Sequence, residues 1–229
     1  MKHYQSTTTP LLTIFATLVA AQNPPSHLPP ASPGVFNPNA SILINAPIDK
    51  VWDAVLNFTA YPEWNPFVRL VKQSTRWLVV LIFNLFRSLM VTDAFGLPLA
   101  DQTAREGAYI IINSQVPPIE GPVNASTTSN PLHTKIDRDM IIHVDTPEKY
   151  QAAWKFAGAP ESVLSAEYWS AVSEVVSGSE TLTFYESREV FNGAIAKFVK
   201  ETYGSGVQKG FEAQATALKA RVEGQLQSK

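Results

Sequence analysis

The chain of 229 residues contains no cysteine. Without thiols it cannot form disulfides, thiolate nucleophiles, zinc–thiolate sites or iron–sulfur clusters. Charge is also sparse: 17% of the residues are charged, the formal net charge is -2, and no run of Lys or Arg could follow a phosphate backbone. We therefore expect no nucleic-acid partner.

Common catalytic motifs are missing as well. The chain has no G-x-S-x-G nucleophile motif, no G-x-G-x-x-G loop and no P-loop. Neither His133 nor His143 has a second histidine at i+2 or i+4, the spacing of common metal sites. Asp137 and Asp139 share one face of a predicted strand, a pattern more typical of a solvated edge than of acid–base catalysis. We predict no metal site and no cofactor.

The N-terminus resembles a secretory signal. Basic Lys2 precedes the apolar run Leu11 to Ala20, and the small residues Ala20 and Ala21 at its end are typical of a cleavage site. A run of ten residues is too short to cross a bilayer. We predict a signal peptide over 1–21, a Pro-rich linker over 22–38 and a secreted protein without a transmembrane segment. The alternative is a buried N-terminal helix, which the flanking prolines disfavour.

Three Asn-X-Ser/Thr sequences are compatible with a secreted glycoprotein. The candidate glycosylation sites are Asn39, Asn57 and Asn124.

Hydrophobic residues make up 45% of the whole chain. From residue 39 onward they recur at regular spacings. Alternation over "NASILINAP" predicts a half-buried strand, and the following "IDKVWDAVL" has the apolar stripe of an amphipathic helix of about three turns. Further strands are predicted over 107–115, 137–144, 150–156, 163–176 and 181–190. Their short separators predict an antiparallel meander.

A long final helix is predicted over 193–225, with Asn192 as its N-cap. Gly204, Gly206 and Gly210 interrupt it, and each costs a helix roughly 1 kcal/mol relative to alanine. We interpret the three glycines as a kink or as a helix face that is pressed closely against a neighbouring element. We also expect them to leave volume free beside the sheet for a ligand.

This order of elements, and several motifs, resemble the START-like (SRPBCC) superfamily, which includes polyketide cyclase/dehydrase-like and coenzyme Q-binding proteins. The resemblance covers Asn39 to about Leu218. It is carried by "ILINAPIDKVWDAVLNFTAYPEWNPFV", "GLPLADQT" and "TLTFYESREVFNG". It implies an α+β helix-grip fold over 39–225, in which a curved antiparallel sheet wraps the C-terminal helix around a hydrophobic cavity. Trp64 and Phe67 would lie at one end of that cavity.

One segment departs from the superfamily pattern. About 25 residues, 71–95, separate "WNPF" from "GLPLA", and Trp77 to Phe83 within them form an apolar run. Three interpretations stay open: an additional buried strand or helix, a lid over the cavity mouth, or an unremoved intron in the gene model.

One face of the strand "TLTFYESREV" is more apolar than the other, and this face carries Phe184, Glu186 and Arg188. We expect this face to point inward. Glu186 and Arg188 would then form either a structural ion pair or a polar anchor on the cavity wall. If the protein is an enzyme, Glu186 would be the general base and Arg188 would stabilise an enolate.

The predicted partner is a small hydrophobic molecule such as a lipid, sterol, quinone or polyketide. Two alternatives are an enzyme of the polyketide cyclase/dehydrase type and a secreted interaction protein whose cavity has collapsed. The candidate ligand-binding residues are Trp64, Phe67, Trp154, Phe156, Tyr168, Phe184, Glu186, Arg188, Phe198, Tyr203, Gly206 and Phe211.

Overall fold

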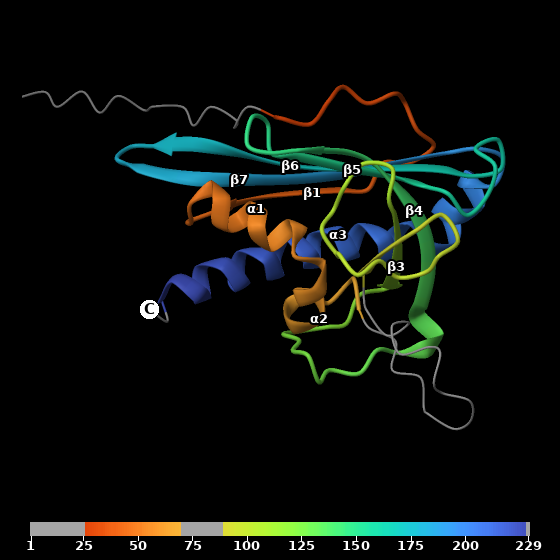
Figure 1. Ribbon diagram of the computed structural model, residues 1–229, viewed down its shortest axis with the longest axis horizontal. Coiled ribbons are helices and arrows are strands. Elements are labelled where there is room, and N and C mark those ends of the chain that lie inside the picture. Colours follow the sequence, from red (N-terminus) through yellow and green to blue (C-terminus); the bar gives the residue numbers. More distant parts are fainter. Residues whose placement is uncertain (1–25, 70–88, 228–229) are drawn as a thin grey trace, which may run out of the picture.

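The computed structural model describes residues 26–69 and 89–227 (Figure 1). The predicted signal peptide, the start of the Pro-rich linker and residues 71–88 of the segment that departs from the superfamily pattern lie outside the described residues. The elements in chain order are β1 (Asn39–Ile44), α1 (Ile48–Leu56), η1 (Phe58–Ala60), α2 (Tyr61–Trp64), β2 (Leu89–Thr92), β3 (Tyr109–Gln115), η2 (Pro131–His133), β4 (Thr134–Asp145), β5 (Gln151–Phe156), β6 (Ser165–Ser177), β7 (Glu180–Asn192) and α3 (Ala196–Gln227).

The strands form one seven-stranded sheet in the order β1-β7-β6-β5-β4-β3-β2. Every neighbouring pair is antiparallel. The predicted meander is therefore confirmed for β3 to β7, and β1 closes the sheet by pairing with β7 rather than with its neighbour in sequence. The edge strand β2 lies within the 71–95 segment, for which an additional buried strand or helix was one of the three open interpretations.

A β-bulge between Ile141 and His143 shifts the register of β4 against β5. Bulges bend a strand and increase its twist. The bend lets the sheet curve around the helices that lie along its inner face (Figure 1).

The helix α1 forms where the apolar stripe predicted it. Val51, Trp52 and Val55 are buried, and the Nε1 of Trp52 donates a hydrogen bond to Thr146 Oγ1 at 2.6 Å. This helix and α3 lie on the same side of the sheet (Figure 1). We call that side the inner face.

The helix α3 packs along β1 and β7. Its fully buried apolar side chains recur at helical spacing and form one stripe: Val207, Phe211, Ala215, Leu218 and Val222. The helix begins later than predicted, because Asn192 is the last residue of β7 and Gly193 turns the chain with a φ of 102°. Asn192 is therefore not the N-cap, but the predicted grip of sheet on helix is confirmed.

Residues 26–38, which we call the N-terminal strap, cross the opposite, outer face of the sheet with their first part (Figure 1). Their last part runs along the edge of β7, where the Phe36 ring lies on the inner side between Phe191 and Gly204 of α3. The backbone of the strap bonds to β7: Val35 N donates to Phe191 O at 2.8 Å, and Phe191 N donates to Phe36 O at 3.1 Å. The rings of Phe36 and Phe191 stack with centroids 4.4 Å apart. The described part of the Pro-rich segment is thus packed on the domain.

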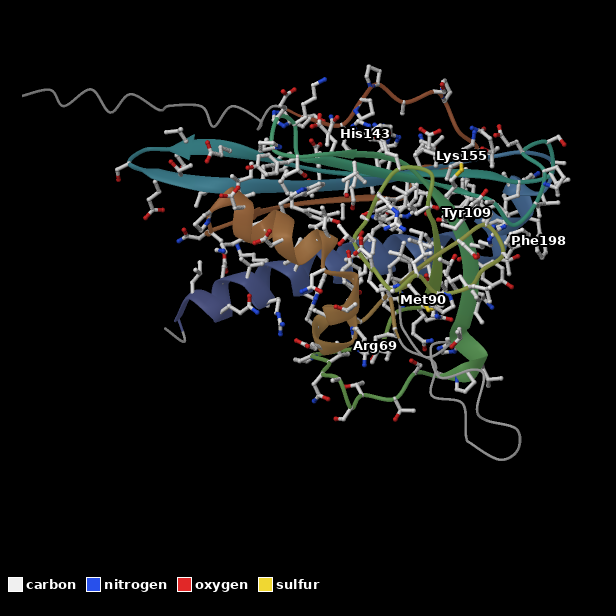
Figure 2. All side chains as sticks on the ribbon, in the orientation of Figure 1. Arg69, Met90, Tyr109, His143, Lys155 and Phe198 are labelled. Carbon is white, nitrogen blue, oxygen red and sulfur yellow. The ribbon has the colours of Figure 1, made fainter. Side chains whose placement is uncertain are left out.

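The corner after α2 is held by Arg69, whose side chain lies within the lower part of the molecule in Figure 2 and is 1% exposed. Its guanidinium donates to the carbonyls of Asn124 at 2.9 Å and Thr127 at 2.8 Å, and also to those of Pro62 and Asn65. Burial lowers the pKa of Arg69. The cation therefore ties the corner to a distant loop through carbonyl dipoles alone.

Within residues 26–69 and 89–227, no helix combines the length and the apolar character needed to cross a membrane.

Candidate functional site

A cavity of about 230 Å³ lies between the inner face of the sheet, α2 and α3. Protein interiors are close-packed, and most of their voids are no larger than a water molecule. A space of this size is therefore a candidate binding site. Its wall consists of Tyr61, Phe67, Val68, Ile112, Ser114, Val116, Lys135, Asp137, Asp139, Trp154, Phe156, Leu164, Ala166, Tyr168, Glu189, Phe191, Val199, Tyr203, Val207, Phe211 and Gln214.

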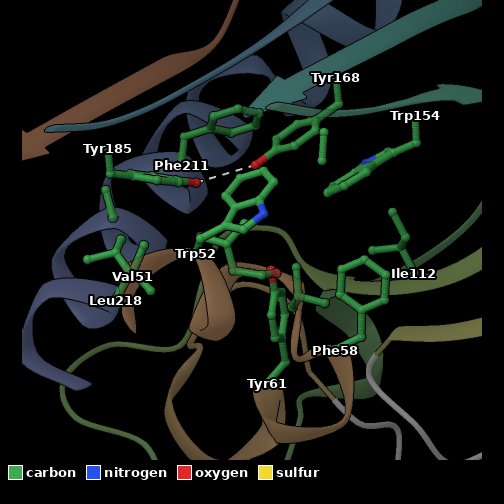
Figure 3. Packing of buried hydrophobic residues seen from close by; sticks show 14 of the residues in the cluster. Val51, Trp52, Phe58, Tyr61, Ile112, Trp154, Tyr168, Tyr185, Phe211 and Leu218 are labelled. Atoms are coloured by element: carbon green, nitrogen blue, oxygen red, sulfur yellow. Dashed lines mark hydrogen bonds between the residues drawn. The ribbon is translucent and has the colours of Figure 1, made fainter. Parts of the chain in front are cut away.

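Aromatic rings cover much of this wall. Trp154 of β5 and Tyr168 of β6 are cross-strand partners, and their rings stack with centroids 4.3 Å apart. Phe211 of α3 closes the space from the other side, 5.8 Å from the Tyr168 ring and 6.1 Å from the Phe67 ring. Figure 3 shows Trp154, Tyr168 and Phe211 gathered around one region. The wall therefore presents ring faces and edges to a ligand.

A chain of polar side chains crosses the structure beside these rings. Asn65 Nδ2 donates to Gln214 Oε1 at 3.0 Å, and Gln214 Nε2 donates to the Tyr185 hydroxyl at 3.3 Å. The hydroxyls of Tyr185 and Tyr168 lie 3.3 Å apart (dashed line in Figure 3). Burial raises the pKa of Tyr168, so its hydroxyl stays protonated and able to donate.

The same Asn65 fixes the turn after α2. Its Oδ1 accepts hydrogen bonds from the backbone amides of Phe67 at 2.9 Å and Val68 at 3.0 Å. Both of these residues line the cavity. The "YPEWNPF" stretch therefore forms an ordered corner of the cavity wall, and this corner places Phe67 against α3.

Three carboxyl groups lie on the wall, and all have raised pKa values. Burial is the largest cause for Asp139, whose pKa is about 8, with repulsion from Asp137 adding to it. Burial also raises the pKa of Asp137 to about 6, and Lys135 partly opposes this increase. Burial raises the pKa of Glu189 well above its usual range, and repulsion from Asp139 and Asp137 adds to the shift. The cavity thus combines an apolar lining with three carboxyl groups of raised pKa, of which Asp139 and Glu189 hold their protons near neutral pH.

No protein-family model matches the chain, and no curated protein sequence matches it. Solved structures do show a likeness. A norcoclaurine synthase point mutant from Thalictrum flavum is 12% identical, with 83% of this chain and 96% of that chain covered and a TM-score of 0.46. A START superfamily protein from Mycobacterium smegmatis is 14% identical, with 82% and 98% covered and a TM-score of 0.44. A hypothetical protein from Helicobacter pylori is 9% identical, with 82% and 88% covered and a TM-score of 0.48.

The fold is an α+β helix grip, in which a seven-stranded antiparallel sheet packs on a long C-terminal helix. At identities this low, the likeness concerns the fold alone.

Half of the predicted ligand-binding residues meet at the cavity. Its wall includes Phe67, Trp154, Phe156, Tyr168, Tyr203 and Phe211. These positions come from α3, from two adjacent strands and from the corner after α2. Their roles in binding remain predictions.

Three other predicted residues do not line the cavity. Trp64 is buried against Tyr61, with ring centroids 4.9 Å apart, and borders a separate polar pocket beside α1. Phe198 is 61% exposed near the start of α3 (Figure 2). A Cβ at Gly206 would come within 2.8 Å of Val116 Cγ1, so this glycine permits a close approach of α3 to Val116 and leaves no free volume. A larger side chain there would overpack the contact.

The predicted orientation of β7 is wrong. Tyr185, Glu189 and Phe191 face the inner side, whereas Glu186 and Arg188 bond to the N-terminal strap on the outer face. Phe184 alternates with Tyr185 and also points outward, because successive side chains of a strand point to opposite faces. None of Phe184, Glu186 and Arg188 lines the cavity. Glu186 is therefore not placed to act as a base on a molecule bound there.

Sequence reasoning missed several wall residues. Gln214 and Glu189 were not singled out, and Asp137 and Asp139 were assigned to a solvated edge, although Asp139 is 5% exposed and lines the cavity. The signal was present in the alternation of Lys135, Asp137, Asp139 and Ile141 along one face of β4, but a face with three charges looks solvated.

Among the described residues, no group of three His, Cys, Asp or Glu side chains is arranged to hold a metal ion. The asparagines of all three predicted glycosylation sites, Asn39, Asn57 and Asn124, are exposed.

Proposed function

We propose that this protein binds, and thereby carries, a small hydrophobic molecule in the cavity between its sheet and α3. One observation supports the proposal above all others: the core contains about 230 Å³ of space lined mainly by aromatic and aliphatic side chains, with few polar groups. Ligand sites commonly combine such an apolar lining with a few convergent polar groups. A secreted interaction protein with a collapsed cavity, the third alternative from the sequence, would not contain this space.

The size of the cavity narrows the ligand. An apolar cavity of about 150 Å³ holds a benzene molecule. The space here therefore suits a molecule with one or two rings, and it is small for a sterol or a long acyl chain. The stacked Trp154 and Tyr168 rings favour a flat aromatic body, because offset and edge-to-face contacts add to the energy of area burial.

The test uses 1-naphthalenemethanol, a neutral bicyclic alcohol, with binding followed by calorimetry. We expect saturable 1:1 binding to the wild-type protein. Ala166 is 5% exposed and lies on the cavity wall, so Ala166→Leu fills part of the space. This variant should lose binding by about tenfold or more, since a methylene misfit in an apolar pocket is worth 10–200-fold.

The matched control is Ala220→Leu on the exposed side of α3, which should bind as the wild type does. Absence of saturable binding to the wild-type protein, or equal binding by Ala166→Leu, would contradict the proposal.

A second candidate function, a cyclase/dehydrase-like enzyme, is favoured by the pKa of about 8 at Asp139. A carboxyl group that titrates near neutral pH can take a proton from carbon and return it to oxygen. Since Glu186 faces outward, this role falls to Asp139. The test is deuterium incorporation next to the carbonyl of 2-acetylnaphthalene, followed by NMR. Exchange that disappears in Asp139→Asn but persists in Glu180→Gln would support catalysis, and binding without exchange would contradict it.

A further inference from the structure

Two separate strands bring three acidic side chains to the cavity wall. Asp137 and Asp139 alternate along the inner face of β4, and Glu189 lies on the inner face of β7. In the sheet, Asp139 is opposite Phe156 and Glu189 is opposite Tyr168. The acids are therefore set among aromatic rings of the strands between them.

In the described parts of the chain, Asp139 and Glu189 have no hydrogen-bond or ion-pair partner, and Asp137 has only the nearby charge of Lys135. Asp139 is 5% exposed, and its Oδ1 has no hydrogen-bond partner. None of the ion pairs found among the described residues includes Asp137, Asp139 or Glu189. Lys135 is on the wall, but its Nζ lies 4.6 Å from the centroid of the Tyr203 ring.

Buried carboxylates are stable when they pair with a cation or receive hydrogen bonds. Because the described part of the chain offers neither to Asp139, the partner it fits is a group on the ligand. A metal ion does not suit the described residues, which hold no group of three suitable ligands. Aromatic faces attract organic ammonium groups as well, so the remainder of the wall favours the same kind of ligand.

We propose that the cavity ligand is a hydrophobic amine, with its rings between the aromatic residues and its ammonium group held by Asp139, Asp137 and Glu189. This inference rests on the proposed function, because it names the class of molecule that the same cavity takes. Lys135 is the one basic side chain on the wall and could attract an anionic group only next to itself. The three acids would repel an anionic ligand from the rest of this region.

The titration of the site supplies a signature of this binding mode. The titratable groups on the wall are Lys135, Asp137, Asp139, Tyr61, Tyr168, Glu189 and Tyr203. Asp139, with a pKa of about 8, is mostly protonated in the empty protein at pH 7. An ammonium group favours the ionised carboxylate, so its binding releases a proton. A neutral alcohol of the same shape does not.

The experiment compares 1-naphthylmethylamine, 1-naphthalenemethanol and 1-naphthoate, which share one ring system and differ in the charge of their polar group. Titrations at about pH 7 in two buffers of different ionisation enthalpy measure both affinity and proton release. We expect the amine to bind about tenfold or more tightly than the alcohol and to release protons, and we expect the naphthoate to bind most weakly.

Asp139→Asn tests the site directly. It should reduce both the preference for the amine over the alcohol and the proton release, with Asp137 and Glu189 accounting for what is left, while Glu180→Gln, at the exposed turn between β6 and β7, should keep both at the wild-type level. Circular dichroism checks that each variant is folded, and proton release by the wild-type protein tests the inference without any variant.

Equal affinity for the amine and the alcohol, or no proton release with the amine, would overturn the inference and leave the proposed function standing. Failure of all three compounds to bind would overturn the proposed function and the inference with it.

Discussion

The two faces of β7 carry acids in opposite circumstances. On the outer face, Glu186 accepts hydrogen bonds from Ser26 Oγ at 2.8 Å and from the amides of His27 at 2.6 Å and Leu28 at 3.3 Å. On the inner face, three residues further along, Glu189 lies on the cavity wall and is repelled by Asp139 and Asp137. One strand therefore holds a carboxylate that the N-terminal strap binds and another carboxyl group whose acidic neighbours on the cavity wall oppose its ionisation.

This difference separates a structural acid from a functional one. A satisfied buried carboxylate contributes to stability, and its removal leaves donors without an acceptor. An unsatisfied one costs stability, and natural proteins keep such groups where a ligand or a reaction uses them. The two kinds are distinguished by the sign of the change in stability on neutralisation.

The largest expected change in stability is on neutralising Asp139 at the cavity. Asp139→Asn should stabilise the protein at alkaline pH by on the order of several kcal/mol, because each pKa unit is worth about 1.4 kcal/mol. The folded pKa of about 8 lies above the usual value of 3.8, so the folded protein holds a proton that the unfolded chain releases. Wild-type stability therefore falls as pH rises from about 4 to 8, and the variant should lose the part of this dependence that comes from Asp139, while Asp137 and Glu189 keep theirs.

Guanidinium unfolding at several pH values measures the effect. The two proteins should converge near pH 4, and a gap that stayed constant from pH 4 to pH 8 would show that Asp139 does not titrate as the burial of its carboxyl group implies.

The second effect has the opposite sign. Glu186→Gln should destabilise the protein by about 1–3 kcal/mol, because hydrogen bonds to a charged acceptor become hydrogen bonds to a neutral one or are lost. The loss should be local to the N-terminal strap, with faster hydrogen exchange at the amides of His27 and Leu28. The exposed Glu180→Gln serves as the control for both faces. Unchanged exchange in the strap would show that Glu186 does not hold it.

The smallest effect is expected at Arg188, whose Nη2 donates to the Pro29 carbonyl at 2.8 Å. Arg188→Lys keeps the charge and one donor but loses the planar, multiply donating guanidinium group. The free energy of unfolding, measured by thermal unfolding, should therefore decrease by about 0.5–1 kcal/mol. A loss as large as that of Glu186→Gln would mean that the strap depends on the cation as much as on the carboxylate.

The periodicity of the sequence predicted the fold well. The alternation of β1, the apolar stripe of α1 and the turn-rich separators of β3 to β7 are all local patterns, and each matches the structure. The sequence left the nature of β2 open, because a four-residue strand carries little periodicity. It also misplaced the start of α3, because asparagine is a common N-cap residue and Asn192 instead ends β7.

The faces of β7 were not predictable in the same way. Alternation shows that two faces exist, and the more apolar one is normally the inner one. Here the N-terminal strap covers part of the outer face, where it binds Glu186 and Arg188 and brings Gly34 close to Val190. Polar Thr183 points inward because its hydroxyl donates to Ala46 O at 2.7 Å, and Tyr185 does so because it bonds to Gln214. These partners are distant in sequence, so no local sequence pattern could have predicted them.

The position of Trp154 gives the protein an optical reporter of its own. Among the four described tryptophans, Trp52, Trp64, Trp154 and Trp169, only Trp154 lies on the cavity wall. Its indole ring is stacked on Tyr168 on the wall of the space that a ligand would fill. A bound aromatic molecule would therefore change the emission spectrum of this one indole ring, and occupancy of the cavity can be followed by light without any label.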